Sequence, residues 1–472
     1  MMTKEEFTGR QRQEATFLVI EEAEGDCMTP ISLYRRMKGD KKFLLESSQL
    51  HHDKGRYSYL GCNPYGELKS IGKQVELTIQ GHTRQFKEHV LHVLKEVIVP
   101  NQVDSPFPFC GGAVGYVGYD VVRQYENIGK ELYNSIHIPE VHLLLYREYV
   151  VYDHVKQKLS FVYVCRKEET TSYEEVCERL QAFKSDILSG SEEQTEVEIS
   201  PLSFAPSITE REFCKMVEKA KAYIRAGDIF QVVLSQRLQS EYKGNPFALY
   251  RKLRTRNPSP YMFYIDFQEY VVLGSSPESF LSVRGNKVMT NPIAGTRPRG
   301  KTKQEDEEIA KELLTNEKEQ AEHIMLVDLA RNDIGRVSEI GSVAIDKYMK
   351  VEKYSHVMHI VSEVYGTFRK RVDWVHALTC CLPAGTVSGA PKVKAMEIIN
   401  ELEQEKRNVY AGAVGYIAFS GDLDMALAIR TMVVKDEKAY VQAGAGIVYD
   451  SDPIAEYKET LNKARALLEV MK

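Results

Sequence analysis

The sequence predicts an α+β protein, in which separate helices accompany strands joined by short turns. Residues 15–75 alternate brief apolar runs with turn signals, which is typical of successive strands. Residues 261–274 and 280–289 each read as a hairpin, the second across a Gly-Asn turn. Residues 412–448 are again strand-rich, and a helical apolar stripe follows them. Runs of such strands together with separate helices indicate the α+β class.

The first part of the chain is expected to carry strands, with two helices among them. Its elements are strands at 16–21, 43–45 and 57–59, a helix at 86–99, a glycine-rich strand at 109–119, strands at 141–152 and 159–164, and a helix at 172–188. Residues 190–206 are acidic, contain serine and proline, and have few large apolar side chains, which is typical of a boundary. We therefore divide the chain into regions 1–200 and 201–472.

The second part begins with a helix that a capping box marks. Thr209 and Glu212 have the spacing at which each side chain binds the other's backbone amide. The elements predicted after that helix are strands at 228–240, the two hairpins, a helix at 317–333, strand-like runs at 342–351 and 355–364, helices at 374–381 and 391–402, strands at 412–419, 425–434 and 439–448, and a last helix. GGAVGY at 111–116 recurs as AGAVGY at 411–416, so these strands are either related or meet the same demand for close packing.

Composition excludes several classes of protein. The 472 residues include 67 acidic and 62 basic side chains, for a net charge of −5, and no dense basic block, so we expect no nucleic-acid partner. No run of about 18 apolar residues occurs, so we expect no membrane span. The polar start is unlike a signal peptide, and the eight cysteines include no C-x-x-C pair. A cytoplasmic protein with reduced thiols is the simplest interpretation.

Two pairs of carboxylates lie on predicted helices. Glu319 and Glu322 are spaced i,i+3, as are Glu456 and Glu459, so each pair shares one helix face. Two helices that each present such a pair suit a hard cation such as Mg²⁺, which prefers oxygen ligands. The alternative is a helix whose first turn is solvated. Asp328, further along the same helix, then simply pairs with Arg331. The apolar run 324–329 predicts that this stretch of helix is buried.

Three glycine-rich segments, 291–300, 382–392 and 442–450, lie outside any ordinary helix. None has the spacing of a phosphate-binding loop, but exposed backbone N–H groups in such loops also bind carboxylates. The alternative is that they are tight turns. Cations that are candidates to bind a dianionic substrate are Arg297, Arg299, Lys392 and Arg430. His356 and His359 lie in a strand-like segment, where a histidine is more often structural than catalytic.

These segments together resemble the chorismate-utilising enzymes. The motifs are PIAGTRPRG, AEHIMLVDLARND, KYSHVMH, GTVSGAPKVKAME, AIRT, QAGAGIV and SDPIAEYKET, in this order over residues 210–472. The resemblance implies a large α/β/β/α sandwich of two facing sheets with outer helices, into which the amino-terminal region is woven. LLES at 44–47 and NPSPYM at 257–262 are similar to one group of that family, the large subunits of anthranilate synthases, which are carbon–oxygen lyases.

Two positions favour this group over its siblings. The water-using siblings carry a lysine base where this chain has Gln231, and aminodeoxychorismate synthases typically carry a lysine where it has Ala294. No glutaminase motif is present, so the resemblance implies a separate glutamine amidotransferase subunit that supplies ammonia. The alternatives are component I of an aminodeoxychorismate synthase and a non-catalytic sensor of chorismate or tryptophan. Loss of a metal-ligand glutamate would indicate a sensor, and all four are present.

The resemblance also implies a role for particular residues. It makes Glu322 and Glu459 direct ligands of Mg²⁺, and it makes Glu319 and Glu456 hold the waters on that ion. It assigns His359 and Thr386 to the reacting ring of chorismate. The substrate-binding residues that it implies are Gly295, Thr296, Tyr410, Arg430, Gly444, Ala445 and Gly446. The product is anthranilate, after ammonia adds and pyruvate leaves.

A tryptophan site is implied in the same way. It comprises Ser47, Pro260, Tyr261 and Met262, and it bridges the amino-terminal region to the catalytic one. The serine hydroxyl and loop N–H groups suit the head group of an amino acid, and the other three side chains offer an apolar wall for an indole. Alternatively, each motif is an ordinary strand end or turn.

Overall fold

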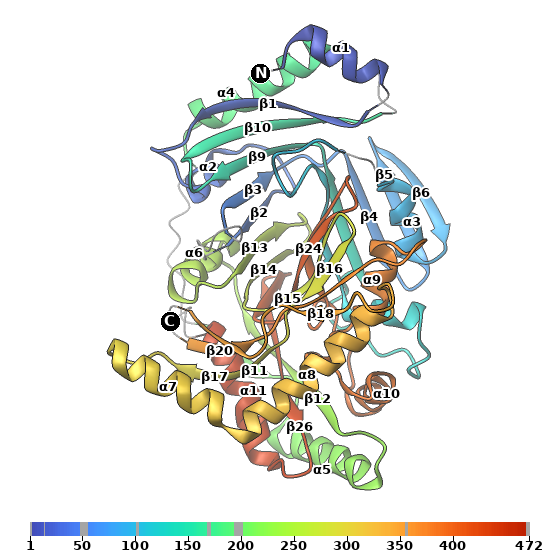
Figure 1. Ribbon diagram of the computed structural model, residues 1–472, viewed down its shortest axis with the longest axis vertical. Coiled ribbons are helices and arrows are strands. Elements are labelled where there is room, and N and C mark those ends of the chain that lie inside the picture. The colour runs from blue at the N-terminus through green and yellow to red at the C-terminus, as the bar shows by residue number, and fades with distance from the viewer. Residues whose placement is uncertain are drawn as a thin grey trace.

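The computed structural model describes residues 2–13, 15–47, 55–100, 103–167, 171–192, 202–354 and 357–468 (Figure 1). Part of the expected boundary at 190–206 and the start of the strand-like run at 355, with His356, lie outside the described residues. Two large antiparallel sheets dominate the described part, and helices cover them, which confirms the α+β class.

The first sheet has twelve strands in the described part of the chain. Its order is β1 (Phe17–Glu24), β10 (Lys158–Cys165), β9 (Glu148–Asp153), β3 (Tyr57–Gly61), β2 (Phe43–Glu46), β13 (Tyr261–Asp266), β14 (Val271–Ser276), β25 (Thr431–Lys435), β26 (Lys438–Ile447), β12 (Gln231–Glu241) and β11 (Ala205–Pro206), with β22 (Gly389–Ala390) also paired to β12. A block of five strands from before residue 200 therefore joins a block from after it in one sheet, at the pair β2–β13.

The second sheet has eleven strands in the same described residues. Its order is β18 (Ala344–Ile345), β21 (Val364–Thr367), β16 (Lys287–Thr290), β15 (Ser279–Arg284), β24 (Leu423–Leu427), β23 (Ala413–Ala418), β7 (Gly112–Val117), β8 (Val141–Tyr146), β4 (Gly66–Ile71), β5 (Gln74–Ile79) and β6 (His82–Lys87). A third, three-stranded sheet has the order β17 (Ile293–Pro298), β20 (Val357–Val361) and β19 (Lys350–Lys353).

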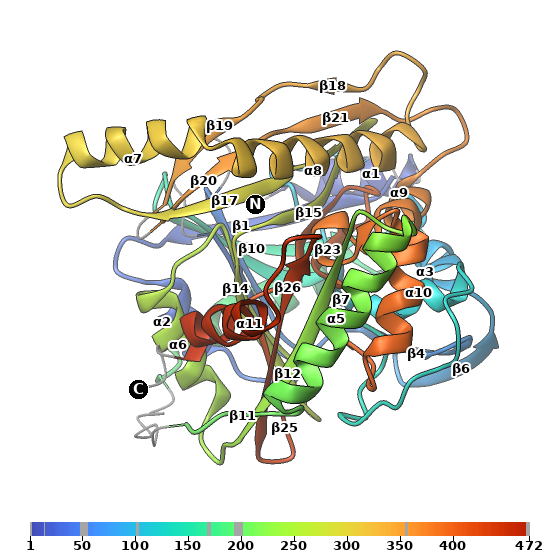
Figure 2. The same ribbon diagram turned by 90° about the horizontal axis from the view of Figure 1, so that it is seen from below.

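Helices lie on the outside of the sheets (Figure 2). They are α1 (Lys4–Arg12), α2 (Pro30–Arg36), α3 (Val90–Val97), α4 (Tyr173–Ser189), α5 (Glu210–Ala226), α6 (Pro246–Arg256), α7 (Lys303–Thr315), α8 (Glu317–Gly335), α9 (Trp374–Cys381), α10 (Lys392–Leu402) and α11 (Pro453–Leu468), with the 3₁₀ turns η1 (Tyr119–Gln124) and η2 (Gly385–Val387). The capping box of Thr209 and Glu212 begins α5 as predicted. No helix of the described residues is long and apolar enough to cross a membrane.

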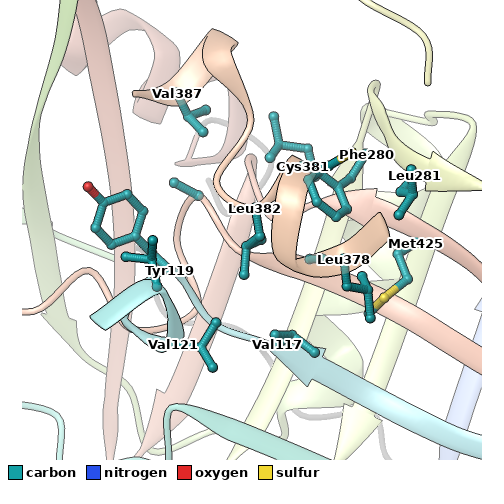
Figure 3. Packing of buried hydrophobic residues seen from close by; sticks show 14 of the residues in the cluster. Val117, Tyr119, Val121, Phe280, Leu281, Leu378, Cys381, Leu382, Val387 and Met425 are labelled. Carbon is teal, nitrogen blue, oxygen red and sulfur yellow. The ribbon is translucent and has the colours of Figure 1, made fainter. Parts of the chain in front are cut away.

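The core has three main parts. An aromatic-rich cluster takes side chains from both large sheets, among them Phe43, Tyr116 and Tyr149, and thus fills the space between them. A second cluster packs the other face of the first sheet against helices. A third lies under α3, α9 and α10 and continues to Val387, next to the loop that bears Thr386 (Figure 3). This layering is the expected sandwich with helices outside.

Two runs that the sequence predicts as single strands each divide between the sheets. The run 141–152 is β8 of the second sheet and β9 of the first, and the chain crosses over at Arg147. The run 425–434 is β24 of the second sheet and β25 of the first. Its crossover contains Arg430 in the left-handed conformation, at φ 48°. Both predictions were wrong because an apolar run does not reveal a change of sheet.

Helix α8 is also less buried than the sequence predicts. His323, Leu326 and Val327 are buried, but Ile324 is 43% exposed. Asp328 lies on the same outer face and pairs with Arg331 at 3.0 Å. The run 324–329 is therefore not buried all round, because α8 lies along the surface of the molecule (Figure 2).

The repeated glycine motif lies in two strands that are direct neighbours. Strands β7 and β23 pair so that Gly115 faces Gly415. A Cβ at Gly115 would lie 2.1 Å from a carbonyl oxygen of β8, and one at Gly415 would lie 2.2 Å from a carbonyl oxygen of β24. The demand for close strand packing therefore explains both copies.

Candidate active site

His359 and the PIAGT motif meet between β17 and β20. These strands pair antiparallel, with an irregularity between Ala294 and Arg297. There the Nδ1 of His359 lies 2.9 Å from the carbonyl oxygen of Gly295 and 3.1 Å from the Oγ1 of Thr296. Gly295 adopts φ +64°, which favours glycine. The structure thus brings together three of the predicted site residues.

The hydrogen bond to Gly295 fixes the tautomer of His359. A carbonyl oxygen only accepts, so Nδ1 carries the proton and Nε2 keeps its lone pair in the neutral ring. The pKa of His359 is lowered to about 4, chiefly by burial; the bond to Gly295 raises it, and the nearby cation of Arg430 lowers it. At neutral pH His359 is therefore a neutral base at Nε2.

The same loop contacts the carboxylate of α8. A Cβ at Gly295 would lie 3.1 Å from the Oε2 of Glu319, so glycine permits this approach. The Nη1 of Arg297 donates to Glu319 at 3.0 Å, and its other nitrogens bind Glu312 at 2.9 and 3.1 Å. Glu319 therefore lies beside the histidine loop, and Arg297 is already paired.

Helices α8 and α11 bring the two predicted carboxylate pairs together. Burial raises the pKa of Glu322, and the negative charges of Glu319 and Glu459 raise it further. Burial likewise raises the pKa of Glu456, again with Glu459 adding to the effect. Lys463 pairs with Glu459 at 2.7 Å. The carboxylates of both helices therefore lie in one electrostatic neighbourhood.

This donor set fits a divalent cation in its chemistry. All four side chains offer oxygen, and such an ion relieves the repulsion that raises the pKa of Glu322 and of Glu456. In the described residues, no three side chains of His, Cys, Asp or Glu lie close enough together to hold a metal ion. Instead, Arg297 and Lys463 each neutralise one carboxylate.

The opposite wall is the glycine-rich end of β26. Gly444 and Gly446 face one side of the sheet, and Ala445 between them is buried in the core on the other. A Cβ at Gly444 would lie 2.6 Å from the hydroxyl of Tyr410, and one at Gly446 would lie 2.5 Å from the Nε2 of Gln231. The two glycines thus leave room for Tyr410 and Gln231, and Ala445 offers its backbone only.

Of the four candidate cations, Arg430 is the one that remains to bind a substrate anion. Arg299 binds Asp306 and Lys392 binds Asp333 at 2.6 Å, so both are paired, like Arg297. Burial lowers the pKa of Arg430, and no carboxylate among the described residues pairs with its guanidinium. The crossover between the two sheets therefore holds an uncompensated cation close to His359.

Sequence reasoning missed Glu278, which lies between β14 and β15. Its side chain is 8% exposed, and burial raises its pKa to about 8 even though the hydroxyl of Thr386 donates to its Oε1 at 3.0 Å. Glu278 is therefore largely protonated at neutral pH and is able to donate a proton. Tyr354 lies between the groups, because its ring meets that of His359 and its pKa responds to both Arg430 and Glu278. A lone glutamate between two strand-like runs, in SSPESFLSV, was the available signal.

The residues that the resemblance implies for a tryptophan site lie at one strand pair, with Met262 in the cluster under the helices and Tyr261 against the cluster between the sheets. Strands β2 and β13 pair so that Met262 faces Glu46, which places Ser47 and Tyr261 at the same end. The hydroxyl of Tyr261 donates to Asp424 at 3.1 Å. Pro260 directly precedes β13. The two motifs, more than 200 residues apart in sequence, are therefore neighbours.

Comparison with known proteins defines the family. The chorismate binding enzyme family matches residues 41–469. Anthranilate synthase component 1 of Lactococcus lactis is 46% identical over 461 residues, which cover 96% of this chain and 99% of that protein. Anthranilate synthase component 1 of Aquifex aeolicus is 44% identical over 459 residues, covering 94% and 92%.

Solved structures agree. Anthranilate synthase component I of Streptococcus pneumoniae has a TM-score of 0.82 at 45% identity and covers 94% of this chain and 98% of its own. The menaquinone-specific isochorismate synthase of Escherichia coli shares the fold, with a TM-score of 0.73 at 19% identity over 99% and 98% of the two chains. Fold and site thus define a chorismate binding enzyme. Within that family, the chain belongs to the anthranilate synthase component 1 proteins.

Proposed function

We propose that this enzyme makes anthranilate from chorismate by adding ammonia and eliminating pyruvate, with Mg²⁺ bound at the carboxylates of α8 and α11. One observation carries the proposal. A neutral base, His359, and a neutral acid, Glu278, lie with an uncompensated cation, Arg430, in the space that these helices border. Amination followed by elimination needs an acid, a base and a site for a carboxylate.

The residues divide the proton transfers between them. Ammonia forms a bond to C2 of the ring, the double bonds shift, and the C4 hydroxyl leaves as water with the proton of Glu278. The ammonium group on C2 gives up a proton, which restores the acid form of Glu278. The Nε2 of His359 then takes the C2 proton as the C3–O bond breaks, and the enolate that leaves takes that proton from His359 and becomes pyruvate. Arg430 binds a substrate carboxylate, and Tyr410 bounds the pocket over Gly444. Bound Mg²⁺ supplies a positive charge to the ring carboxylate.

The uncharged side chains at two positions of the site support ammonia as the nucleophile. Gln231 has no basic nitrogen with which to deprotonate water, and it lies against Gly446 in the site. Ala294 is 7% exposed and has no nucleophilic group. Neutral ammonia is already a good nucleophile, whereas water must first be deprotonated, so ammonia needs neither group. We therefore assign its supply to a separate glutamine amidotransferase subunit.

We further propose that tryptophan inhibits the enzyme from the site between β2 and β13. A short connection supports this proposal. Met262 faces Ser275 of β14, and the amide of Ser275 donates to the carbonyl of Arg430 at 3.1 Å. A ligand that moves β13 would therefore act on the backbone of Arg430, the cation proposed to bind the substrate.

Anthranilate fluorescence during incubation with chorismate, Mg²⁺ and ammonium tests the proposal. We expect anthranilate and pyruvate in equal amounts. An aminated, non-aromatic product without pyruvate would instead indicate an aminodeoxychorismate synthase. Binding of chorismate without any product would indicate a sensor.

A further inference from the structure

Arg407 lies buried behind the site, with each of its guanidinium nitrogens hydrogen-bonded. Its Nε and Nη2 bind the two carboxylate oxygens of Glu403 at 2.8 and 2.6 Å. Its Nη1 donates to the carbonyl of Val387 at 2.7 Å, and Nη2 donates also to the carbonyl of Val233 at 2.7 Å. Such bonds are directional, so they fix the distance and angle between the groups they join.

The two carbonyls belong to different walls of the site. Val387 ends the turn η2 that carries Thr386, the hydroxyl of which binds the acid Glu278. Val233 lies on β12 opposite Gly446, in the strand pair that forms the glycine-rich wall. Arg407 therefore ties the turn bearing Thr386 to the wall formed by β12 and β26.

The guanidinium of Arg407 also lies over two tyrosine rings. Its Cζ lies 4.8 Å from the ring centroid of Tyr119 and 5.6 Å from that of Tyr410. Cation–π attraction at these distances favours one ring position. The hydroxyl of Tyr410 in turn lies against Gly444. Arg407 thus contacts the ring of Tyr410 and the backbone of the turn that bears Thr386.

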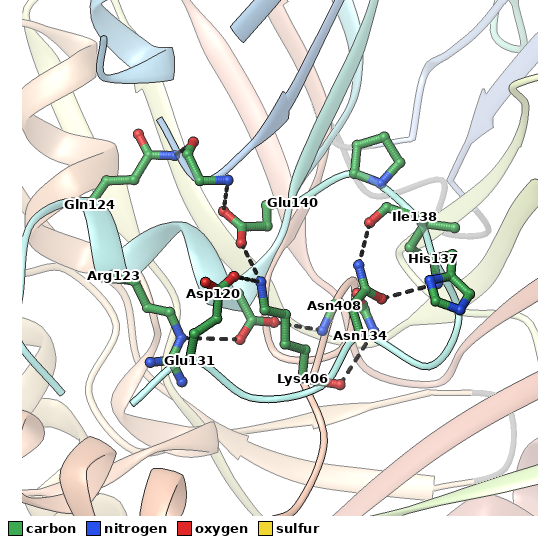
Figure 4. Close-up of polar contacts among 12 residues, drawn as sticks. Asp120, Arg123, Gln124, Glu131, Asn134, His137, Ile138, Glu140, Lys406 and Asn408 are labelled. Carbon is green, nitrogen blue, oxygen red and sulfur yellow. Dashed lines mark hydrogen bonds and ion pairs between the residues drawn. The ribbon is translucent and has the colours of Figure 1, made fainter. Parts of the chain in front are cut away.

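The backbone around Arg407 is held from the amino-terminal region. Lys406 binds the buried Glu140 at 2.8 Å, and the amide of Asn408 donates to Asp120 at 2.8 Å (Figure 4). Glu403 is held as well, because its Oε1 accepts from the amide and the hydroxyl of Ser235, both at 2.8 Å. Arg407 is therefore a fixed point and not a mobile surface arginine.

Stability alone does not account for this arrangement. Desolvating a buried arginine and glutamate costs about as much as their pairing returns, so packed apolar side chains often serve stability as well. What they do not supply is four bonds in set directions. We propose that Arg407 is a positioning residue, which sets Thr386 and Tyr410 against the substrate. This inference rests on the proposed function.

The test compares Arg407→Lys with Arg237→Lys. Arg237 is also buried on β12, pairs with Glu405 and binds the carbonyl of Lys406, but it donates to neither Val387 nor Val233. A lysine keeps the charge and loses the planar set of donors. We expect Arg407→Lys to lower kcat for ammonia-dependent anthranilate formation at least tenfold and to change KM for chorismate less. Arg237→Lys should keep kcat within about threefold of wild type. Equal loss in both variants would overturn the inference.

A double-mutant cycle with Thr386→Val separates positioning from general damage. If Arg407 acts through Thr386, that substitution should cost clearly less kcat in the Arg407→Lys background than in wild type. Additive losses would contradict the inference. Glu403→Asp, which shortens the partner and keeps both charges, serves the same cycle if Arg407→Lys does not fold. Absence of anthranilate from wild type would refute the proposed function itself, a result distinct from these.

Discussion

Glu278 and His359 are the two residues that set the expected pH dependence of turnover. The proposed reaction needs Glu278 protonated, which holds below its pKa of about 8, and His359 neutral, which holds above its pKa of about 4. Activity should therefore fall as the pH rises through about 8 and as it falls through about 4.

Thr386→Val should move the alkaline limb of this profile upward. The hydroxyl of Thr386 donates to Glu278 and stabilises its anion, so its removal raises the pKa of the carboxyl. A hydrogen bond of about 1 kcal/mol corresponds to a shift of about 0.7 pH unit. Thr386→Ser keeps the hydroxyl and is the control. Profiles of kcat against pH decide, and a downward or absent shift in the valine variant would exclude Glu278 as the acid.

His359→Ala should separate amination from elimination. The variant lacks the base at Nε2 but keeps Glu278 and Arg430. Chorismate is therefore still aminated, but its enolpyruvyl group stays on the ring. Chromatography of the products should show a non-aromatic amino compound in place of anthranilate. Anthranilate at the wild-type rate would mean that His359 is a structural histidine of β20.

At the scale of elements, helices α8 and α11 matter through the charges that they bring together. Glu322→Gln keeps the shape and removes one carboxylate, and we expect turnover to fall by about 10²–10³, as when a charged transition state loses a partner. Glu317→Gln, in the exposed first turn of the same helix, is the control. Both variants should keep the wild-type circular dichroism. Near-normal turnover of a folded Glu322→Gln would remove this residue from the metal site.

Most elements were predictable because their signals are local. The capping box at Thr209, the two hairpins and α9 occur where the periodicity and turn residues place them. The crossover at Arg430 was not predictable, because residues 425–434 read as one apolar strand. The signal for Glu278 is equally weak in sequence, since its pKa depends on burial by distant elements. Motif resemblance implied roles for Arg430 and Thr386 but did not reveal how each is held.

At the scale of the whole molecule, each large sheet joins a block of strands from the amino-terminal region to a block from the carboxy-terminal region. Strand β2 of the amino-terminal region pairs with β13 of the carboxy-terminal region, and the β13–β14 hairpin ends beside Arg430. A ligand at the junction of β2 and β13 is therefore linked through one sheet to Arg430, the cation proposed to bind the substrate. By linkage, chorismate and tryptophan should weaken each other's binding by the same factor.

Ser47→Arg should relieve inhibition by tryptophan and leave uninhibited turnover nearly unchanged. The long cationic side chain would fill the space beside β13, which the amino acid is proposed to use, and it adds nothing next to Glu278 or His359. Titration with tryptophan at fixed chorismate checks this, with Ser203→Arg at an exposed serine as the control. Tryptophan should also raise the Tm of wild type and of the control, but not of Ser47→Arg, because a ligand that binds only the folded state stabilises it. Equal inhibition curves for all three proteins would place the tryptophan site elsewhere, and a wild type that millimolar tryptophan does not inhibit would remove the regulation altogether.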